Sequence, residues 1–130
     1  MDATSEVVHD RTWVRAGTAE RIAGEVGAWP GIEVDRSEEG EVAFKLGVRE
    51  LGHLHGDGVA HFSFPKSTWR ELHDRGRITH HPVFPGQEGP GARRITTESD
   101  ERDVVALFRS IYDRVVARLG VPGERGSSAA

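Results

Sequence analysis

The sequence RELGHLHGDGVAH, residues 49–61, decides how we expect the chain to fold. Side chains alternate between the two faces of a β-strand. A strand from Val48 to about His55 would therefore have one face with both polar and apolar side chains. That face would hold Arg49, Leu51, His53 and His55. Gly-Asp-Gly at 56–58 is typical of a tight turn. The stretch therefore predicts a β-hairpin that is rich in histidine.

The strand after this turn, Val59 to Phe64, also alternates. Ala60, Phe62 and Phe64 share one predicted face, and Val59, His61 and Ser63 share the other. If the two strands pair across the turn, His61 falls on the same side of the sheet as His53 and His55. A register shift of one residue would reverse this placement.

The rest of the chain predicts helices and strands in alternating groups. We expect helices over residues 10–26, from a Thr68 cap to Gly76, and from Ser99 to Gly120, and further strands over 32–36, 42–46, 77–83 and 93–97. This order predicts an α+β domain with a mainly antiparallel sheet and about three helices packed on one face. The histidines would then lie on the opposite face. The domain would span 11–120, between a flexible segment 1–10 and a disordered tail 121–130.

Composition limits the classes of function. The 130 residues suffice for one domain, and the absence of cysteine excludes disulfides, thiolate metal sites and a cysteine nucleophile. A net charge of −4 gives no general attraction to nucleic acid or to an anionic membrane. No apolar run could span a bilayer and the start does not resemble a signal peptide, so we expect a cytoplasmic protein. The Ala/Gly/Arg-rich usage indicates a bacterial gene.

A metal site is one interpretation of the His53-Leu54-His55 pair. The pair resembles the opening of the cupin motif, in which two histidines, a glutamate and a later histidine hold a metal ion. Here His61 would be the third ligand, because no glutamate follows His55 at the required distance and only Asp57 is near. A metal-dependent enzyme is therefore kept as an alternative.

Acid–base chemistry is the other interpretation. Histidine titrates near neutrality and can take up or return a proton. Any single histidine here is best explained as a structural residue. Five histidines from three segments, however, are expected to converge: His53, His55, His61, His80 and His81. Glu50 would point to the other face and form only a surface pair with Arg49.

Several short motifs, taken in order, resemble the luciferase-like domain that fungal luciferases share with small bacterial proteins. They are Arg49-Glu50, His53-x-His55, His61 in an apolar strand, Leu72 with Gly76, His81-Pro82 and Val104-Val105, within residues 45–118. Fungal luciferases oxidise 3-hydroxyhispidin with molecular oxygen, without a metal or organic cofactor. The resemblance implies a pocket that deprotonates an enol so that its anion can react with oxygen.

The resemblance also implies roles for particular residues. His53, His55, His61 and His81 would be catalytic, and Arg49 would bind an anionic group of the substrate. Apart from the resemblance, we expect His80 and Arg77 to be further substrate-binding residues. The expected partners are a small molecule and, for an enzyme, oxygen; no cofactor, nucleic acid or membrane is expected. Domain resemblance does not transfer a substrate, so a non-catalytic ligand-binding module is a further alternative.

Overall fold

The computed structural model describes residues 13–122 of the chain. In chain order its elements are α2 (Thr18–Val26), β1 (Ile32–Arg36), β2 (Val42–Leu46), β3 (Arg49–His55), β4 (Val59–Ser63), α3 (Lys66–Asp74), β5 (Thr79–His80), β6 (Pro90–Arg94) and α4 (Glu98–Leu119). The predicted flexible segment 1–10 and most of the predicted tail 121–130 lie outside the described residues.

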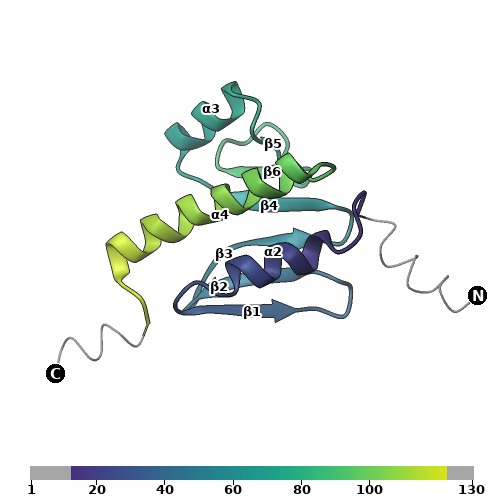
Figure 1. Cartoon of the computed structure of the whole chain (residues 1–130). Helices are drawn as coiled ribbons and strands as arrows, with labels where there is room; N and C mark the ends of the chain where they lie inside the picture. The colour runs from purple at the N-terminus through teal and green to yellow at the C-terminus, as the bar shows by residue number, and fades with distance from the viewer. Residues whose placement is uncertain (1–12, 123–130) are drawn as a thin grey trace, which may run out of the picture.

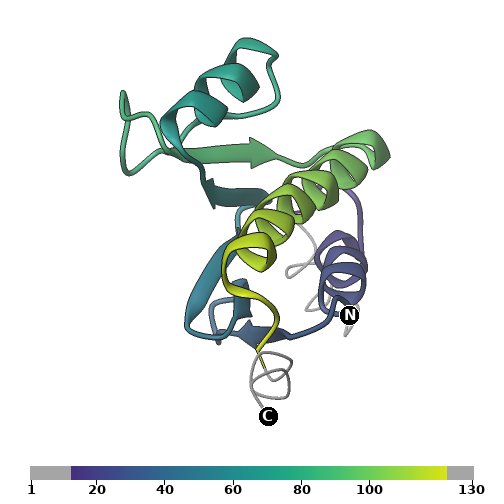
Figure 2. The ribbon, with the colours of Figure 1, turned by 90° about the vertical axis from the view of Figure 1, so that its left-hand side faces the viewer.

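The strands form one six-stranded sheet in the order β1-β2-β3-β4-β6-β5. Every neighbouring pair in it is antiparallel. Helices α2 and α4 cross the same face of this sheet in both views, and α3 lies at its β5–β6 end (Figures 1 and 2). The predicted α+β architecture with an antiparallel sheet is therefore confirmed.

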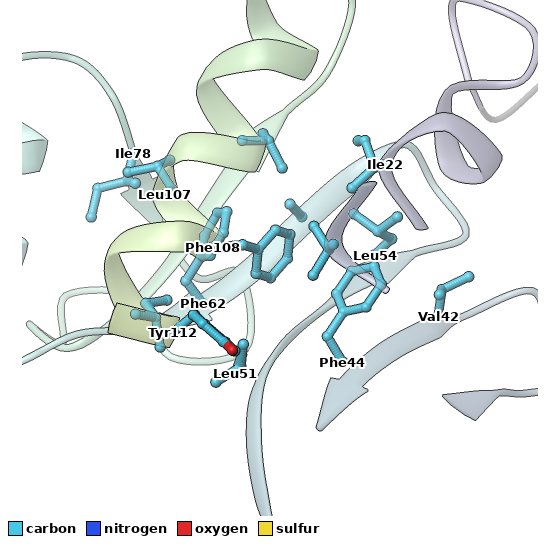
Figure 3. Packing of buried hydrophobic residues seen from close by; sticks show 14 of the residues in the cluster. Ile22, Val42, Phe44, Leu51, Leu54, Phe62, Ile78, Leu107, Phe108 and Tyr112 are labelled. Carbon is cyan, nitrogen blue, oxygen red and sulfur yellow. The ribbon is translucent and has the colours of Figure 1, made fainter. Parts of the chain in front are cut away.

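Aromatic side chains fill the core between the sheet and α4. The Phe108 ring is fully buried and meets Phe44 edge-on at 5.1 Å and Phe62 at 4.7 Å between ring centroids (Figure 3). Truncating a buried phenylalanine of this kind to alanine typically costs about 3–5 kcal/mol of stability. These contacts fix β2 and β4 against α4, and so fix the face of the sheet that points away from the helices.

The alternation of β3 is interrupted by a β-bulge. Phe44 pairs with Gly52 and Lys45 pairs with Glu50, so Leu51 is the extra residue. Leu51 is 2% exposed and Leu54 is 0% exposed, and both belong to the core. The prediction that Leu51 shares a face with His53 is therefore wrong, because a bulge shifts the alternation by one residue.

Gly52 lies at this bulge because no side chain would fit there. A Cβ atom at this position would lie 2.5 Å from the carbonyl oxygen of His61 and 2.8 Å from Phe108. The bare backbone lets β3 approach β4 and α4 closely. This agrees with the sequence interpretation that the glycine leaves room for a close approach.

Two predicted helix starts are wrong by several residues. α2 begins at Thr18 rather than near residue 10, because Gly17 has a left-handed backbone with φ of +79°. α3 begins at Lys66, directly after Pro65, and has no side-chain cap. The hydroxyl of Thr68, the predicted cap, instead accepts a hydrogen bond from Arg114 at 3.4 Å.

The last strands and helix also differ from their predicted limits. The strand predicted over 77–83 reduces to Thr79–His80, because Pro82 cannot donate and the chain turns at His81. The strand predicted over 93–97 is Pro90–Arg94.

Beyond β6, the chain is held by the cap of α4 rather than by the sheet. Asp100 accepts the backbone N–H groups of Thr96 and Thr97. Thr97, not the predicted Ser99, caps α4 and forms a capping box with Asp100. Among the described residues, no helix is both long and apolar enough to span a membrane.

Candidate functional site

The register of the hairpin brings two histidines directly opposite each other. His53 on β3 pairs with His61 on β4, as Leu54 pairs with Ala60. Ala60 and Leu54 belong to the core under the helices. Because neighbouring residues on a strand point to opposite faces, His53 and His61 lie on the face turned away from the helices. This is the side predicted from the sequence.

Four of the five predicted histidines come together on this face. The ring centroids of His53 and His55 lie 5.0 and 5.2 Å from that of His61. His81, from the turn after β5, approaches His61 most closely, at 4.2 Å. Two side chains from β3 and one from a later turn therefore surround the buried imidazole of His61 on β4.

Hydrogen bonds connect the side chains of Glu50, His53 and His61 in series. Nδ1 of His53 lies 3.0 Å from Oε2 of Glu50. Nε2 of the same ring lies 3.1 Å from Nδ1 of His61. The other nitrogen of His61, Nε2, is buried and has no hydrogen-bond partner among the described residues. We call this series of hydrogen-bonded side chains, Glu50–His53–His61, the relay.

The relay has two consistent protonation states. An ionised Glu50 can only accept, so Nδ1 of His53 must donate to it. With a neutral His53, Nε2 accepts from Nδ1–H of His61, which leaves Nε2 of His61 as a free base. With a charged His53, Nε2–H donates to Nδ1 of His61, and the proton of His61 then sits on Nε2. The two states differ by one proton, and the charge rests beside Glu50.

Burial makes His61 itself a poor place for a positive charge. The side chain is 6% exposed. Desolvation, and then the charges of His81, His53 and His55, lower the pKa of His61 from its ordinary value to about 4. A neutral His61 is therefore the resting form, and a proton taken up at its Nε2 is best stabilised by the shift of charge to His53.

The remaining two histidines border the relay. Nε2 of His55 lies 3.4 Å from Glu41, and its buried Nδ1 lies 3.1 Å from Asp57 without hydrogen-bond geometry. Nδ1 of His81 accepts the backbone N–H of Val83 at 3.1 Å. Burial, followed by the charges of His53 and His55, lowers the pKa of His81.

A hollow of about 240 Å³ opens beside the relay. Its walls, as far as the described residues form them, are Glu50, Leu51, Gly52, His53, His61, Phe62, Ser63, His81, Phe84 and Pro90. Glu50 is the one carboxylate among these lining residues, and none of them is a lysine or an arginine. The hollow is smaller than the usual range of about 300–1,000 Å³ for ligand pockets, so it suits one ring of a ligand.

A larger cleft of about 700 Å³ lies between α2 and α4, near the opposite face of the sheet. Its charged side chains pair with one another: Arg21 donates to Glu101 at 2.9 Å and Arg15 binds the same carboxylate. Among the described residues, the buried side-chain nitrogen and oxygen atoms without a hydrogen-bond partner belong to His55 and His61, and neither residue lines this cleft. Chemistry, rather than size, favours the histidine hollow.

His80 is the histidine that does not join the group. In the sheet, His80 pairs with Gly91 and its neighbour Thr79 pairs with Ala92. Ala92 also pairs with His61, so Thr79 lies on the same face of the sheet as His61. Alternation therefore turns His80 toward the helix side, where its ring lies 4.9 Å from that of Trp69. The structure does not bring this predicted substrate-binding residue to the hollow.

The two predicted substrate-binding arginines also lie elsewhere. Arg49 borders a separate cleft with Val115 and Leu119 at the end of α4, because the bulge places it on the helix side. Arg77 donates to Asp103 through Nε at 3.1 Å and Nη2 at 2.5 Å. That pair ties the start of β5 to α4.

The alternative metal site is not formed in the part of the chain that the structure describes. Within residues 13–122, no group of three or more His, Asp or Glu side chains converges as metal ligands would. His53, His55 and His61 gather, yet Nε2 of His53 and Nδ1 of His61 face each other and share a hydrogen bond of 3.1 Å. This geometry does not offer the three-histidine site that a cupin-like enzyme would need.

Glu50 is the site residue that the sequence interpretation missed. Strict alternation places it on the far face, whereas the bulge at Leu51 turns it toward His53. The available signal was Gly52, since an isolated glycine within a strand often marks a bulge. Its role as a charge partner emerges only from the fold.

Comparison with protein families supports the resemblance drawn from the sequence. Residues 48–110 match the family model described as Luciferase domain, and Glu50 and all four clustered histidines fall within this range. A luciferase-like domain in this segment is therefore confirmed. Searches among curated proteins and among solved structures found no match.

Proposed function

Starting from a luciferase-like domain at residues 48–110, we propose that the hollow beside the relay binds a small enolic or aromatic molecule and removes a proton from it. The resulting anion then reacts with molecular oxygen. The protein would be an oxygenase that works by histidine acid–base catalysis, without a metal or organic cofactor.

The observation that carries this proposal is the buried Nε2 of His61 at the end of the relay, which has no partner among the described residues. A substrate hydroxyl donates to this nitrogen and transfers its proton there. The Nδ1–H proton of His61 moves to His53, whose positive charge is stabilised by Glu50 at 3.0 Å. His61 is a weak base by itself because its ring is buried. It becomes effective because the positive charge moves from its ring to His53.

Deprotonation supplies what oxygen chemistry needs from the protein. An enolate is more easily oxidised than the parent enol, and it can transfer one electron to triplet oxygen. The two radicals then combine to a peroxide at the carbon atom, so the substrate is the reductant and oxygen the oxidant. Phe84, an apolar residue of the lining, helps to keep water away from this intermediate.

The hollow favours an uncharged, flat ligand. Among the described residues that line it, Glu50 is the one Asp, Glu, Lys or Arg, and its carboxylate would repel a carboxylate on the substrate. Its volume of about 240 Å³ accepts one ring, so a larger molecule would extend past Phe84, which is partly exposed.

Substrate binding requires a local rearrangement, because Nε2 of His61 is covered in this conformation. His81 is the best candidate to move. Its ring lies against His61 at 4.2 Å, and the hydrogen bond that holds it comes from the N–H of Val83, two residues further along the same turn. Moved aside, His81 would form the second wall around the ligand.

The direct test offers purified protein 3-hydroxyhispidin and simpler cyclic enols while oxygen uptake and light are recorded. Turnover that falls in His61→Gln and in a His53→Ala, His81→Ala double variant, but persists in His73→Ala, supports the proposal. Equal rates in all folded variants would reject it for those substrates. A ligand that stabilises the fold and is recovered unchanged would favour the non-catalytic binding module.

A further inference from the structure

In the proposed function, the proton that His61 accepts would stay on the relay. The proton accepted at Nε2 of His61 ends on the relay, between His53 and Glu50. Nε2 itself has no contact with water in this conformation, since its surface is buried. A stored proton of this kind is available to be given back to the bound molecule.

We propose that the same site catalyses an oxygen-independent reaction, the interconversion of keto and enol forms of small, uncharged cyclic carbonyl compounds. This inference rests on the proposed role of His61 as general base. It does not require oxygenation to occur.

The step balances without any further reactant. Nε2 of His61 takes the hydroxyl proton of the enol, so that the O–H bond breaks and the carbon–carbon double bond becomes a single bond. The relay then returns a proton to the α-carbon, where a new C–H bond forms, and the oxygen is left as a carbonyl. No electrons leave the substrate, and the reverse sequence regenerates the enol.

The geometry allows one base to serve both atoms. The oxygen and the α-carbon of an enol are separated by a single carbon atom and lie in one plane, so a small shift of the ring moves the reacting atom past Nε2. The surroundings restrict the competing loss of the proton, because His53, His55 and His81 enclose His61. Phe84 gives the hollow an apolar side against which the ring of the ligand can lie.

The choice of substrate class follows from the lining. Glu50 is its only formally charged member among the described residues, which disfavours keto acids, and the volume of about 240 Å³ suits one ring. Cyclohexane-1,2-dione, which is uncharged and forms a cyclic enol, is a suitable probe. Pyruvate is the matched charged probe, and we expect it to be a much poorer substrate.

The experiment follows deuterium incorporation at the α-carbon of cyclohexane-1,2-dione by proton NMR, without oxygen, in deuterium oxide. Wild-type protein should exchange this position at least about tenfold faster than buffer, and His61→Gln and Glu50→Gln should lose most of this acceleration. His73→Ala, a histidine on the other side of the sheet, should match wild type. Circular dichroism checks that each variant is folded.

Each outcome separates the two proposals. Exchange that depends on His61, with no oxygen uptake in air by any enol, supports this inference and rejects the oxygenase. Oxygen uptake without anaerobic exchange overturns this inference alone. Exchange that is equal in wild type and in folded His61→Gln and Glu50→Gln also overturns it, because the relay would then play no part.

Discussion

Two groups of histidines lie on opposite sides of this sheet, and only one has the features of a reactive site. The relay group gathers around His61, which is 6% exposed and has a pKa lowered to about 4. The second group, which we call the edge cluster, is Trp69, His73 and His80. Its rings are equally close, with His73 stacked on Trp69 at 4.7 Å and His80 at 5.1 Å from His73.

The difference lies in burial and in partners, not in the number of imidazoles. His73 and His80 are exposed, so water can satisfy their nitrogens. In the relay, the carboxylate of Glu50 fixes one ring, that ring fixes the next, and a buried nitrogen is left without a partner among the described residues. Clustering of histidines is therefore weak evidence of function unless the hydrogen bonds assign their protons.

The largest expected effect is the loss of activity on replacing the terminal base. His61→Gln should lower turnover of an accepted enol by about 10²- to 10⁴-fold, the usual contribution of a general base. His73→Ala should leave turnover within about twofold, because its ring lies in the edge cluster. Steady-state oxygen uptake measures both. Comparable losses in the two variants would remove the distinction between the clusters.

Replacing the carboxylate of the relay should act through the proton positions. In a Glu50→Gln variant, the new side-chain amide can donate to Nδ1 of His53, which would reverse the direction of both hydrogen bonds and place a proton on Nε2 of His61. We expect a fall in turnover of about 10²-fold. Stability should change by less than about 1 kcal/mol, since the Glu50 side chain is 44% exposed. A large loss of stability with unchanged turnover would make Glu50 a structural residue instead.

The lowered pKa of His61 predicts how stability depends on pH. The unfolded chain binds a proton near the ordinary histidine pKa of 6.5, whereas folded His61 does so only near 4. Between these values the unfolded state holds more protons, so stability decreases as the pH falls, by at most about 3 kcal/mol. His53, His55, His81 and Asp57 face this ring and modulate the size of the effect.

Urea unfolding across this pH range measures the dependence. His61→Gln should flatten it, while His73→Ala should retain it, because His73 is an exposed residue of the edge cluster and does not contact His61. The same slope in wild type and His61→Gln would show that His61 is not buried in its neutral form.

The smallest expected effect concerns the ion pair that supports the edge strand. Arg77→Ala removes the hydrogen bonds that Nε and Nη2 donate to Asp103 and should lower the free energy of unfolding by about 1–2 kcal/mol. Asp103 keeps its contact with Arg93 at 2.6 Å, which limits the loss. Thermal unfolding measures it. An unchanged midpoint would mean that the pair contributes nothing to the β5 side of the sheet.

The sequence predicts the regular parts of the fold well. In β4 the alternation is uninterrupted, so the burial of Ala60 and Phe62 and the opposite placement of His61 follow directly. The short Gly-Asp-Gly turn sets the register that opposes His53 and His61. These features depend on neighbouring residues alone, which is why a pattern can reveal them.

What the sequence does not reveal depends on contacts between distant segments. The bulge at Leu51 lies in the pairing of β2 with β3, and it decides that Glu50, rather than Arg49, joins the site. His80 and His81 are adjacent, and alternation along the strand already turns His80 to the helix side, so the expectation that both would join one site is wrong. The position of His81 against His61 depends on the turn that follows β5.

Glu50 orders the protons of the relay so that Nε2 of His61 is a free base. Nitrogen NMR of the imidazole rings at neutral pH tests it directly, because protonated and bare ring nitrogens differ strongly in chemical shift. We predict that His61 is neutral with its proton on Nδ1, donated to Nε2 of His53, and that its Nε2 is bare. A proton on Nε2 of His61, with Nδ1 bare, would contradict the account.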